Sequence, residues 1–203
     1  MQLFLASSLD QVKELFIEKI WNINWRRIWF ISNPADIDRE WDIEPRWVKS
    51  DREMLESLWW IISHINLKNI KNDELFSAIS DCDILYVSWW NTRYFKILAD
   101  ESWFQKIIDE LIIKKWMTYI STSAGSCIMW TSIKYMDPDD FKIEQWYGLV
   151  NAMILPHWWN DSFKDEYNET VMPKIYNDAQ NIITLTDNQV IYMDNNWITI
   201  LWK

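Results

Sequence analysis

The chain has 203 residues, 49% of them hydrophobic, which is enough for one domain with a substantial core. Thirty acidic and twenty basic side chains give a net charge of −10, which repels nucleic-acid phosphates and anionic membrane surfaces. We therefore expect a single domain over 1–203 that binds a small molecule, a peptide or a protein, and neither nucleic acid nor a membrane.

Short apolar runs alternate along the chain with segments of helical spacing. Strands are predicted over 3–7, 27–33, 60–67, 83–89, 117–122, 149–157 and 181–187. Helices are predicted over 44–59, 72–81, 91–100, 101–116 and 161–178, with Asn91 and Ser102 as N-caps. Two alternating runs around Asp194-Asn195-Asn196 predict a C-terminal β-hairpin. The pattern is typical of an α/β fold in three layers, a mostly parallel sheet with helices on both faces.

In such sheets the ligand site lies at the carboxyl ends of the strands, here near 88–91, 121–126 and 156–160. Ser123 fits the pattern of a nucleophile elbow, because Ser121 and Gly125, two positions away on each side, are small. The preceding apolar run supplies a strand and the following residues can begin a helix. The same pattern also occurs in turns that only cap a helix.

A serine nucleophile needs a base, and the chain has two histidines. His64 is flanked by apolar residues and is typical of a structural strand histidine. His157 follows Pro156 at the end of a predicted strand and is the better candidate. The orienting carboxylate of a triad is predicted in the loop that contains Asp137, Asp139 and Asp140, and the sequence leaves the choice among them open.

Three segments carry a resemblance to a known family: SWWNTRYF (88–95), YISTSAGSCIMWTSIKYMD (119–137) and LVNAMILPH (149–157). Together they resemble the dipeptidase E family of serine peptidases, relatives of cyanophycinase with the class I glutamine-amidotransferase-like fold. The similarity extends over nearly the whole chain, from QLFLAS to the terminal hairpin.

The resemblance implies roles for several residues. Ser123 matches the family nucleophile, His157 the base, and either Asp137 or Asp139 the acid, since position 138 is proline. Ala124 would supply one oxyanion-hole N–H, and the family's Gly-Gly-Asn-Thr loop would supply another. In this chain that loop reads Trp89-Trp90-Asn91-Thr92, with Asn91 and Thr92 as candidate substrate contacts.

Tryptophan stands where glycine is expected at several positions. The chain has 17 tryptophans and two glycines, whereas average usage, about 7%, predicts about fourteen glycines. Residues 59, 89, 90, 103, 116, 130 and 197 are tryptophan in glycine-like contexts. We hypothesise that UGA codons, which some genetic codes read as glycine, have been translated as tryptophan. As written, the chain is expected to be a strongly impaired hydrolase, because indoles at 89 and 90 would crowd the oxyanion hole.

The substrate is expected to be a short peptide. The dipeptidase E arginine that selects an N-terminal aspartate corresponds to Val171, so aspartyl specificity is not expected unless Lys164, Lys174 or Arg93 takes its place. The alternative is a non-catalytic small-ligand binding protein on the same fold, with Trp89, Trp90, Trp158 and Trp159 as an aromatic platform.

Neither a cofactor motif nor a metal-ligand spacing is apparent in the sequence. Cys82 and Cys127 are typical of reduced residues, and the start of the chain shows no cleavable leader. No apolar run approaches the ~20 residues of a membrane span. These features predict a cytoplasmic protein, either a monomer or a homodimer.

Overall fold

The computed structural model assigns positions to most of the chain. It describes residues 1–20, 26–38, 44–58, 60–70, 72–88, 91–131, 146–177, 181–195 and 197–203. The predicted acids Asp137 and Asp139, and the loop residues Trp89 and Trp90, lie outside the described residues.

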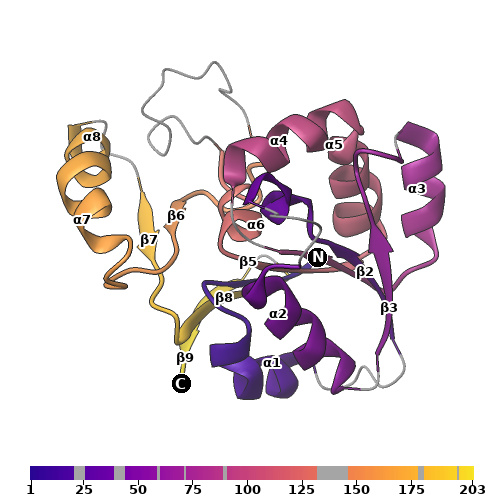
Figure 1. Cartoon of the computed structure of the whole chain (residues 1–203), viewed down its shortest axis with the longest axis horizontal. Coiled ribbons are helices and arrows are strands. Elements are labelled where there is room, and N and C mark those ends of the chain that lie inside the picture. The colour runs from indigo at the N-terminus through magenta and orange to yellow at the C-terminus, as the bar shows by residue number, and fades with distance from the viewer. Residues whose placement is uncertain are drawn as a thin grey trace.

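A seven-stranded sheet forms the centre of the molecule (Figure 1). Its strands are β1 (Gln2–Ala6), β2 (Arg27–Ile31), β3 (Ile61–Ile65), β4 (Ile84–Val87), β5 (Thr118–Thr122), β8 (Gln189–Asp194) and β9 (Trp197–Trp202). The spatial order is β3-β2-β4-β5-β1-β8-β9, and β8 and β9 are antiparallel while the first five strands are parallel. The predicted fold, a mostly parallel α/β sheet with a C-terminal hairpin, is confirmed.

Helices cover both faces of this sheet (Figure 1). Helices α1 (Lys13–Ile20) and α2 (Arg46–Glu56) lie on one face. The other face carries α3 (Asn72–Ser80), α4 (Thr92–Glu101), α5 (Phe104–Ile107), the π-helical η3 (Ile108–Lys114) and α6 (Ala124–Cys127). The short 3₁₀ helix η1 (Asp10–Val12) directly precedes α1, and a second one, η2 (Asn33–Asp38), follows β2 and contacts α4.

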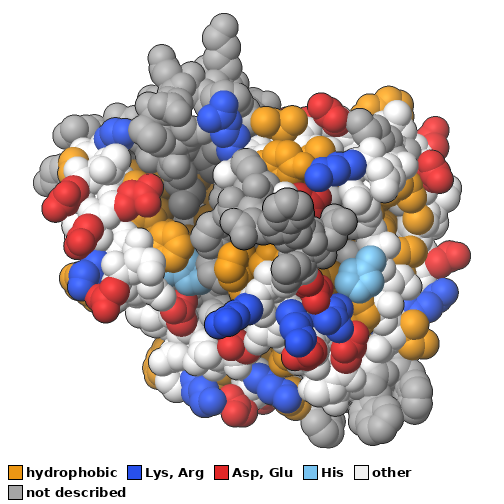
Figure 2. All heavy atoms as spheres, in the orientation of Figure 1, with side chains coloured by type: hydrophobic (Ala, Val, Ile, Leu, Met, Phe, Trp, Pro, Cys, Tyr) orange, Lys and Arg blue, Asp and Glu red, His pale blue; other side chains and the backbone are white. Residues whose placement is uncertain are grey.

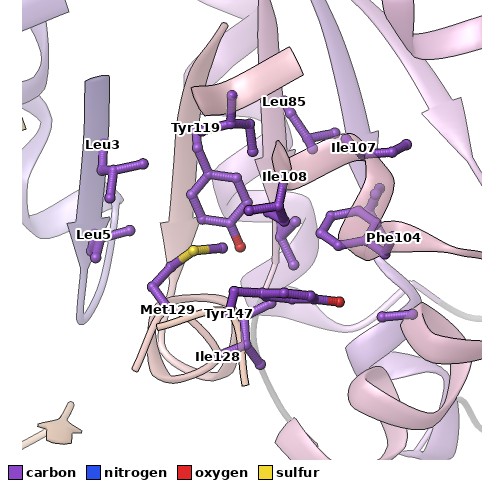
Figure 3. Close-up of a cluster of buried hydrophobic side chains, with 14 of the residues drawn as sticks. Leu3, Leu5, Leu85, Phe104, Ile107, Ile108, Tyr119, Ile128, Met129 and Tyr147 are labelled. Atoms are coloured by element: carbon purple, nitrogen blue, oxygen red, sulfur yellow. The ribbon is translucent and has the colours of Figure 1, made fainter. Parts of the chain in front are cut away.

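Two buried clusters fill the space between the sheet and its helices, because successive side chains of a strand point to opposite faces. Phe4 and Ala6 of β1 pack with α1 and α2, whereas Leu3 and Leu5 pack with α3, α4 and α5. Figure 3 shows the second cluster, in which the Tyr119 ring lies among aliphatic side chains from several elements. This two-sided burial explains why the strands read as continuous apolar runs.

A smaller unit lies in the chain between α6 and β8. Strands β6 (Met153–Leu155) and β7 (Ile182–Thr184) form their own two-stranded parallel sheet, with α7 (Lys164–Glu166), η4 (Tyr167–Val171) and α8 (Met172–Asn177) between them. The sequence predicted both strands but not that they leave the central sheet. Three-residue strands carry too little pattern to reveal which sheet they join.

Two further details differ from the prediction. Helix α1 is not among the predicted elements, although Val12, Phe16 and Ile20 recur at helical spacing and are buried. Ser102 was predicted as an N-cap, but it closes the C-terminal end of α4: its N–H donates to the Leu98 carbonyl and its hydroxyl to the Ala99 carbonyl. Asn91 is an N-cap as predicted, with its side chain accepting the Tyr94 N–H.

Acidic and basic side chains are interspersed on the face shown in Figure 2, rather than gathered by sign. Among the described residues, no helix has both the length and the apolar character needed to cross a membrane.

Candidate active site

Ser123 lies at a sharp turn between β5 and α6. Its φ of 45° and ψ of −108° are unusual for a residue with a Cβ, and its side chain is buried. The Ser123 N–H donates to the Ala6 carbonyl of β1 at 3.0 Å. Three residues later, the Ser126 hydroxyl donates to the same carbonyl at 2.9 Å. The end of β1 therefore fixes the turn at both its first residue and its last.

Gly125 allows this turn to pack against the end of β4. A Cβ at Gly125 would lie 2.7 Å from the Val87 carbonyl oxygen and 2.9 Å from Cβ of Ser121, both too close for a real side chain. The Gly125 carbonyl in turn accepts a hydrogen bond from the buried Tyr119 hydroxyl at 2.8 Å. The residues that follow β4 therefore begin directly beside the Ser123 turn.

His157 is held at the same end of β1. It follows β6, adopts φ 58° and is buried. Its N–H donates to the Ser7 hydroxyl at 2.7 Å, and Ser7 directly follows the Ala6 that anchors Ser123. Two consecutive residues, Ala6 and Ser7, thus bring together the turn at Ser123 and the histidine from a segment about thirty residues away in the chain.

Asp187 is the carboxylate that faces His157. Asp187 Oδ1 lies 2.6 Å from His157 Nδ1 and accepts the Ser7 hydroxyl at 2.8 Å, and Asp187 Oδ2 accepts the Asn160 amide at 3.2 Å. Ser7 Oγ is also 3.2 Å from His157 Nδ1. The carboxylate at Nδ1 favours the tautomer with the proton on that nitrogen, which makes Nε2 the nitrogen that can accept a proton.

The charge of this pair follows from its contacts. Partial burial would raise the pKa of Asp187, but the hydrogen bonds from His157, Ser7 and Asn160 outweigh it and lower the pKa to about 2. Asp187 is therefore ionised at neutral pH and can stabilise a protonated imidazole. The Phe163 ring stacks on His157 with the ring centroids 5.0 Å apart, which further fixes the imidazole plane.

The other predicted site residues divide into three groups. Ala124 is the first residue of α6 and directly follows Ser123, as an oxyanion donor would. Asn91 and Thr92 begin α4, and the Asn91 side chain serves as the helix cap. His64 is exposed on β3, where its ring meets Phe30 edge-on at 5.3 Å, and it takes no part in the cluster around Ser7.

Another carboxylate, Asp51 of α2, is buried and bonds to the end of β5 just before the Ser123 turn. Its Oδ2 accepts a short hydrogen bond from the Tyr86 hydroxyl of β4 and another from Thr122 Oγ1 at 3.3 Å. Thr122 is the last residue of β5 and directly precedes Ser123. Burial, reinforced by the nearby charge of Asp10, raises the pKa of Asp51 to about 7, although the bonds from Tyr86 and Thr122 oppose this shift.

Replacing Asp51 by asparagine is expected to flatten the pH dependence of stability. In the folded protein Asp51 keeps its proton up to about pH 7, whereas the ordinary value for the carboxyl is 3.8. This group therefore makes the folded state less stable by about 4 kcal/mol as pH rises through that whole window, and about 2.5 kcal/mol of this loss falls between pH 5 and pH 8. Urea unfolding at about pH 5 and about pH 8 would measure the difference. Asp161→Asn, which changes an exposed carboxylate, is the control; equal slopes for Asp51→Asn and the unsubstituted chain would contradict the expectation.

A cavity of about 480 Å³ opens at the opposite end of the sheet. It is lined by Gln2, Ile84 and Thr118, the first residues of β1, β4 and β5. Ser123, which follows the last residue of β5, lies at the other end of these strands. The cavity is therefore separate from the cluster that contains Ser123.

Comparison with known proteins identifies the family. The sequence pattern that defines peptidase family S51 matches residues 3–201. The chain belongs to peptidase family S51. This membership supports a peptidase of the serine type, which is the family's class.

Several relatives and solved structures resemble this S51 peptidase. An uncharacterized peptidase of Listeria monocytogenes is 24% identical over 198 residues, covering 94% of this chain and 93% of the relative. An uncharacterized peptidase of Listeria innocua is 27% identical over 169 residues, covering 80% of this chain and 78% of the relative. A Listeria monocytogenes crystal structure, provisionally assigned as a peptidase E, superposes with a TM-score of 0.85 at 24% identity, covering 100% of this chain and 98% of that one. A peptidase structure from an acI-B1 Actinobacterium superposes with a TM-score of 0.72 at 17% sequence identity, covering 100% of this chain and 87% of that one.

The sequence predicted Ser123 and His157 but not Asp187. Asp187 follows β7 and precedes β8, in a Thr-Asp-Asn stretch that reads as an ordinary polar turn. It is the last residue of the predicted strand 181–187, which is the same positional signal that singled out His157. Asp137 and Asp139, the predicted acids, lie outside the described residues, so that prediction stays a prediction.

Proposed function

We propose that this S51 peptidase hydrolyses short peptides with Ser123 as nucleophile, His157 as general base and Asp187 as the carboxylate that orients the base. The observation that carries the proposal is the anchoring of Ser123 and His157 on the consecutive residues Ala6 and Ser7, with Asp187 on His157 Nδ1. A serine at a strained strand-to-helix turn, an imidazole and a partly buried carboxylate are the parts that acyl transfer to serine requires.

The reaction would proceed in two stages, acylation and deacylation, and in each stage His157 accepts one proton and gives it up again. Nε2 accepts the Ser123 hydroxyl proton as Oγ attacks the scissile carbonyl carbon, and the imidazolium then gives that proton to the leaving amine. Asp187 stabilises the imidazolium between these steps, because it stays ionised. The Ala124 N–H is positioned by sequence to donate to the oxyanion, together with a donor from the loop after β4. Water, deprotonated by His157, then attacks the carbonyl carbon of the acyl-enzyme; the bond to Ser123 Oγ breaks, the imidazolium returns the proton to Oγ, and the acid product leaves.

Cys127 does not compete for the role of nucleophile. It lies one helical turn beyond Ser123, is buried, and its thiol approaches the Ile154 carbonyl at 3.5 Å. Burial raises the pKa of Cys127 to about 12, so the reactive thiolate is disfavoured at neutral pH. This environment favours a serine mechanism over the cysteine chemistry of glutamine amidotransferases.

The alternative, a small-ligand binding protein, receives less support from the described residues. Trp158 stacks on Tyr167 with ring centroids 5.9 Å apart and packs in a buried cluster with Phe163, so much of its surface is already used. Of the four tryptophans in the suggested platform, only two lie among the described residues, and of those Trp159 alone is mostly exposed, at 65%.

A fluorophosphonate probe tests the proposed nucleophile. Such a probe phosphonylates an activated serine, so the chain is expected to be labelled at Ser123, and Ser123→Ala is expected to abolish labelling. Ser77→Ala, which changes an exposed serine of α3 away from this turn, is the control and is expected to keep the label. Because Trp89 and Trp90 are expected to slow acylation, the same comparison is made in a Trp89→Gly/Trp90→Gly chain. Absence of labelling in both backgrounds would refute the proposal.

The proposal also covers the compartment, the substrate class and the oligomeric state of the peptidase. Cys82 and Cys127 are both free thiols among the described residues, in keeping with a reducing cytoplasm. The position that would bind a substrate carboxylate through arginine is Val171, which is buried in the small unit, so aspartyl dipeptides are not the proposed substrates. The active peptidase is proposed to be a monomer or a homodimer.

A further inference from the structure

Seven described residues other than glycine have positive φ, a region that side chains with a Cβ rarely adopt. They are Asn72, Trp103, Trp116, Ser123, His157, Trp159 and Asn195. Asparagine tolerates this conformation, and the two residues of the candidate active site can hold functional strain. Three tryptophans remain, and tryptophan is among the least suited residues because it is bulky.

Trp103 occupies a position that helices ordinarily give to glycine. It follows Ser102, the C-cap of α4, and has φ 59° and ψ 37°, the left-handed conformation. Helices commonly end with a left-handed residue directly after the C-cap, and that residue is usually glycine. The Trp103 side chain is 53% exposed, so burial of the indole does not explain its presence.

Trp116 repeats this arrangement at the end of η3. It follows the C-cap Lys115 and has φ 63°, and the next N–H, from Met117, returns to the Leu111 carbonyl at 3.0 Å. Such a returning bond, donated by a buried apolar residue, is typical of helix ends closed by a left-handed glycine. The Trp116 side chain is 59% exposed.

Trp159 is the third residue of a tight turn. The Asn160 N–H donates to the His157 carbonyl at 2.9 Å, and Trp159 between them has φ 69° and is 65% exposed. Turns with positive φ at the third residue strongly favour glycine there. Gly148, one of the two glycines of the chain, has a similar φ of 65°.

We propose that residues 103, 116 and 159 are glycine in the polypeptide that the source organism makes, and that the tryptophans arise from UGA codons which that organism reads as glycine. Backbone conformation and the shortage of glycine support this independently of each other. The proposal does not rest on the function of the site, since these three positions are defined by helix ends and a turn.

Two tryptophans predicted as glycine-like do not meet the same criterion. Trp130 is buried in the cluster with Met153 and Leu155, and Trp197 pairs with Asp194 as the first residue of β9, next to a turn in which Asn195 has positive φ. Neither has positive φ. Their backbone therefore gives no reason for glycine, and Trp59 lies outside the described residues.

The identity of the residues can be measured directly. Mass spectrometry of the protein purified from the source organism, together with the codons of its gene, is expected to show glycine encoded by UGA at 103, 116 and 159. UGG codons, or peptides with tryptophan at these positions, would overturn the proposal.

The conformational argument has its own test in full-length variants. At each of the three positions glycine and alanine are compared, since both remove the indole and only alanine keeps a Cβ. At each position the glycine variant is expected to be more stable than the alanine variant, by about threefold to tenfold in the folding equilibrium constant. At Trp202, an exposed residue of β9 without positive φ, the order is expected to reverse. Alanine variants as stable as glycine variants at 103, 116 and 159 would defeat this argument.

Discussion

A chain with glycine in place of both Trp89 and Trp90 is expected to hydrolyse short peptides about 10²- to 10³-fold faster than the chain as written, the effect of gaining one oxyanion-hole donor. These residues follow β4, whose last residue, Val87, packs against the Ser123 turn at Gly125. Glycine would let a loop N–H approach the carbonyl oxygen and would accept the dihedral angles this requires.

The residues that flank this loop are already fixed beside the turn. The Ser88 N–H donates to the Ile31 carbonyl at 2.9 Å, and the Asn91 N–H donates to the Pro34 carbonyl at 3.1 Å. Because both ends are held, two glycines should change the local backbone without releasing α4. Initial rates on a dipeptide library measure the gain, with Trp202→Gly on β9 as a control far along the sheet. Equal rates for the double variant and the parent would show that the loop does not limit hydrolysis.

The fold was largely predictable because its information is local. Strands β1, β2, β4 and β5 are buried on both faces and read as apolar runs, and Asn91 marks the start of α4 by a side chain that can cap. The candidate site was predictable in part for the same reason: Ser123 directly follows β5, and His157 lies two residues after the end of β6. Their neighbours in the sequence, small residues around Ser123 and Pro156 before His157, point to turns.

The remainder depends on contacts between distant segments. Asp187 is the partner of His157 only because β1 brings Ser7 between them, a relation that no local pattern encodes. The Asp51 carboxylate lies in an ordinary amphipathic helix, and its burial against Tyr86 and Thr122 follows from how α2 packs on the sheet. The positive φ of Trp159 likewise arises from a turn whose sequence, Trp-Trp-Asn, predicts no glycine-dependent conformation.

Asp187→Asn is expected to lower the turnover rate about 10⁴-fold, the size of loss that follows when a base is held in the wrong tautomer. The carboxylate accepts from Ser7, His157 and Asn160 at once. An amide in its place must direct its NH₂ at one of these donors. If that donor is His157, Nδ1 becomes the acceptor and the proton moves to Nε2, which can then no longer deprotonate Ser123.

The rate is measured in the Trp89→Gly/Trp90→Gly background, as peptide turnover and as fluorophosphonate labelling of Ser123. Asp161→Asn is the matched control, because that carboxylate is exposed and pairs only with Lys164 among the contacts of the described chain. Asp137→Asn and Asp139→Asn test the alternative, in which the acid of the triad is one of these two aspartates and not Asp187. If either of them loses activity while Asp187→Asn stays within about tenfold of the parent, the orienting carboxylate lies in the segment after α6, and Asp187 serves only to hold Ser7 and His157 in place.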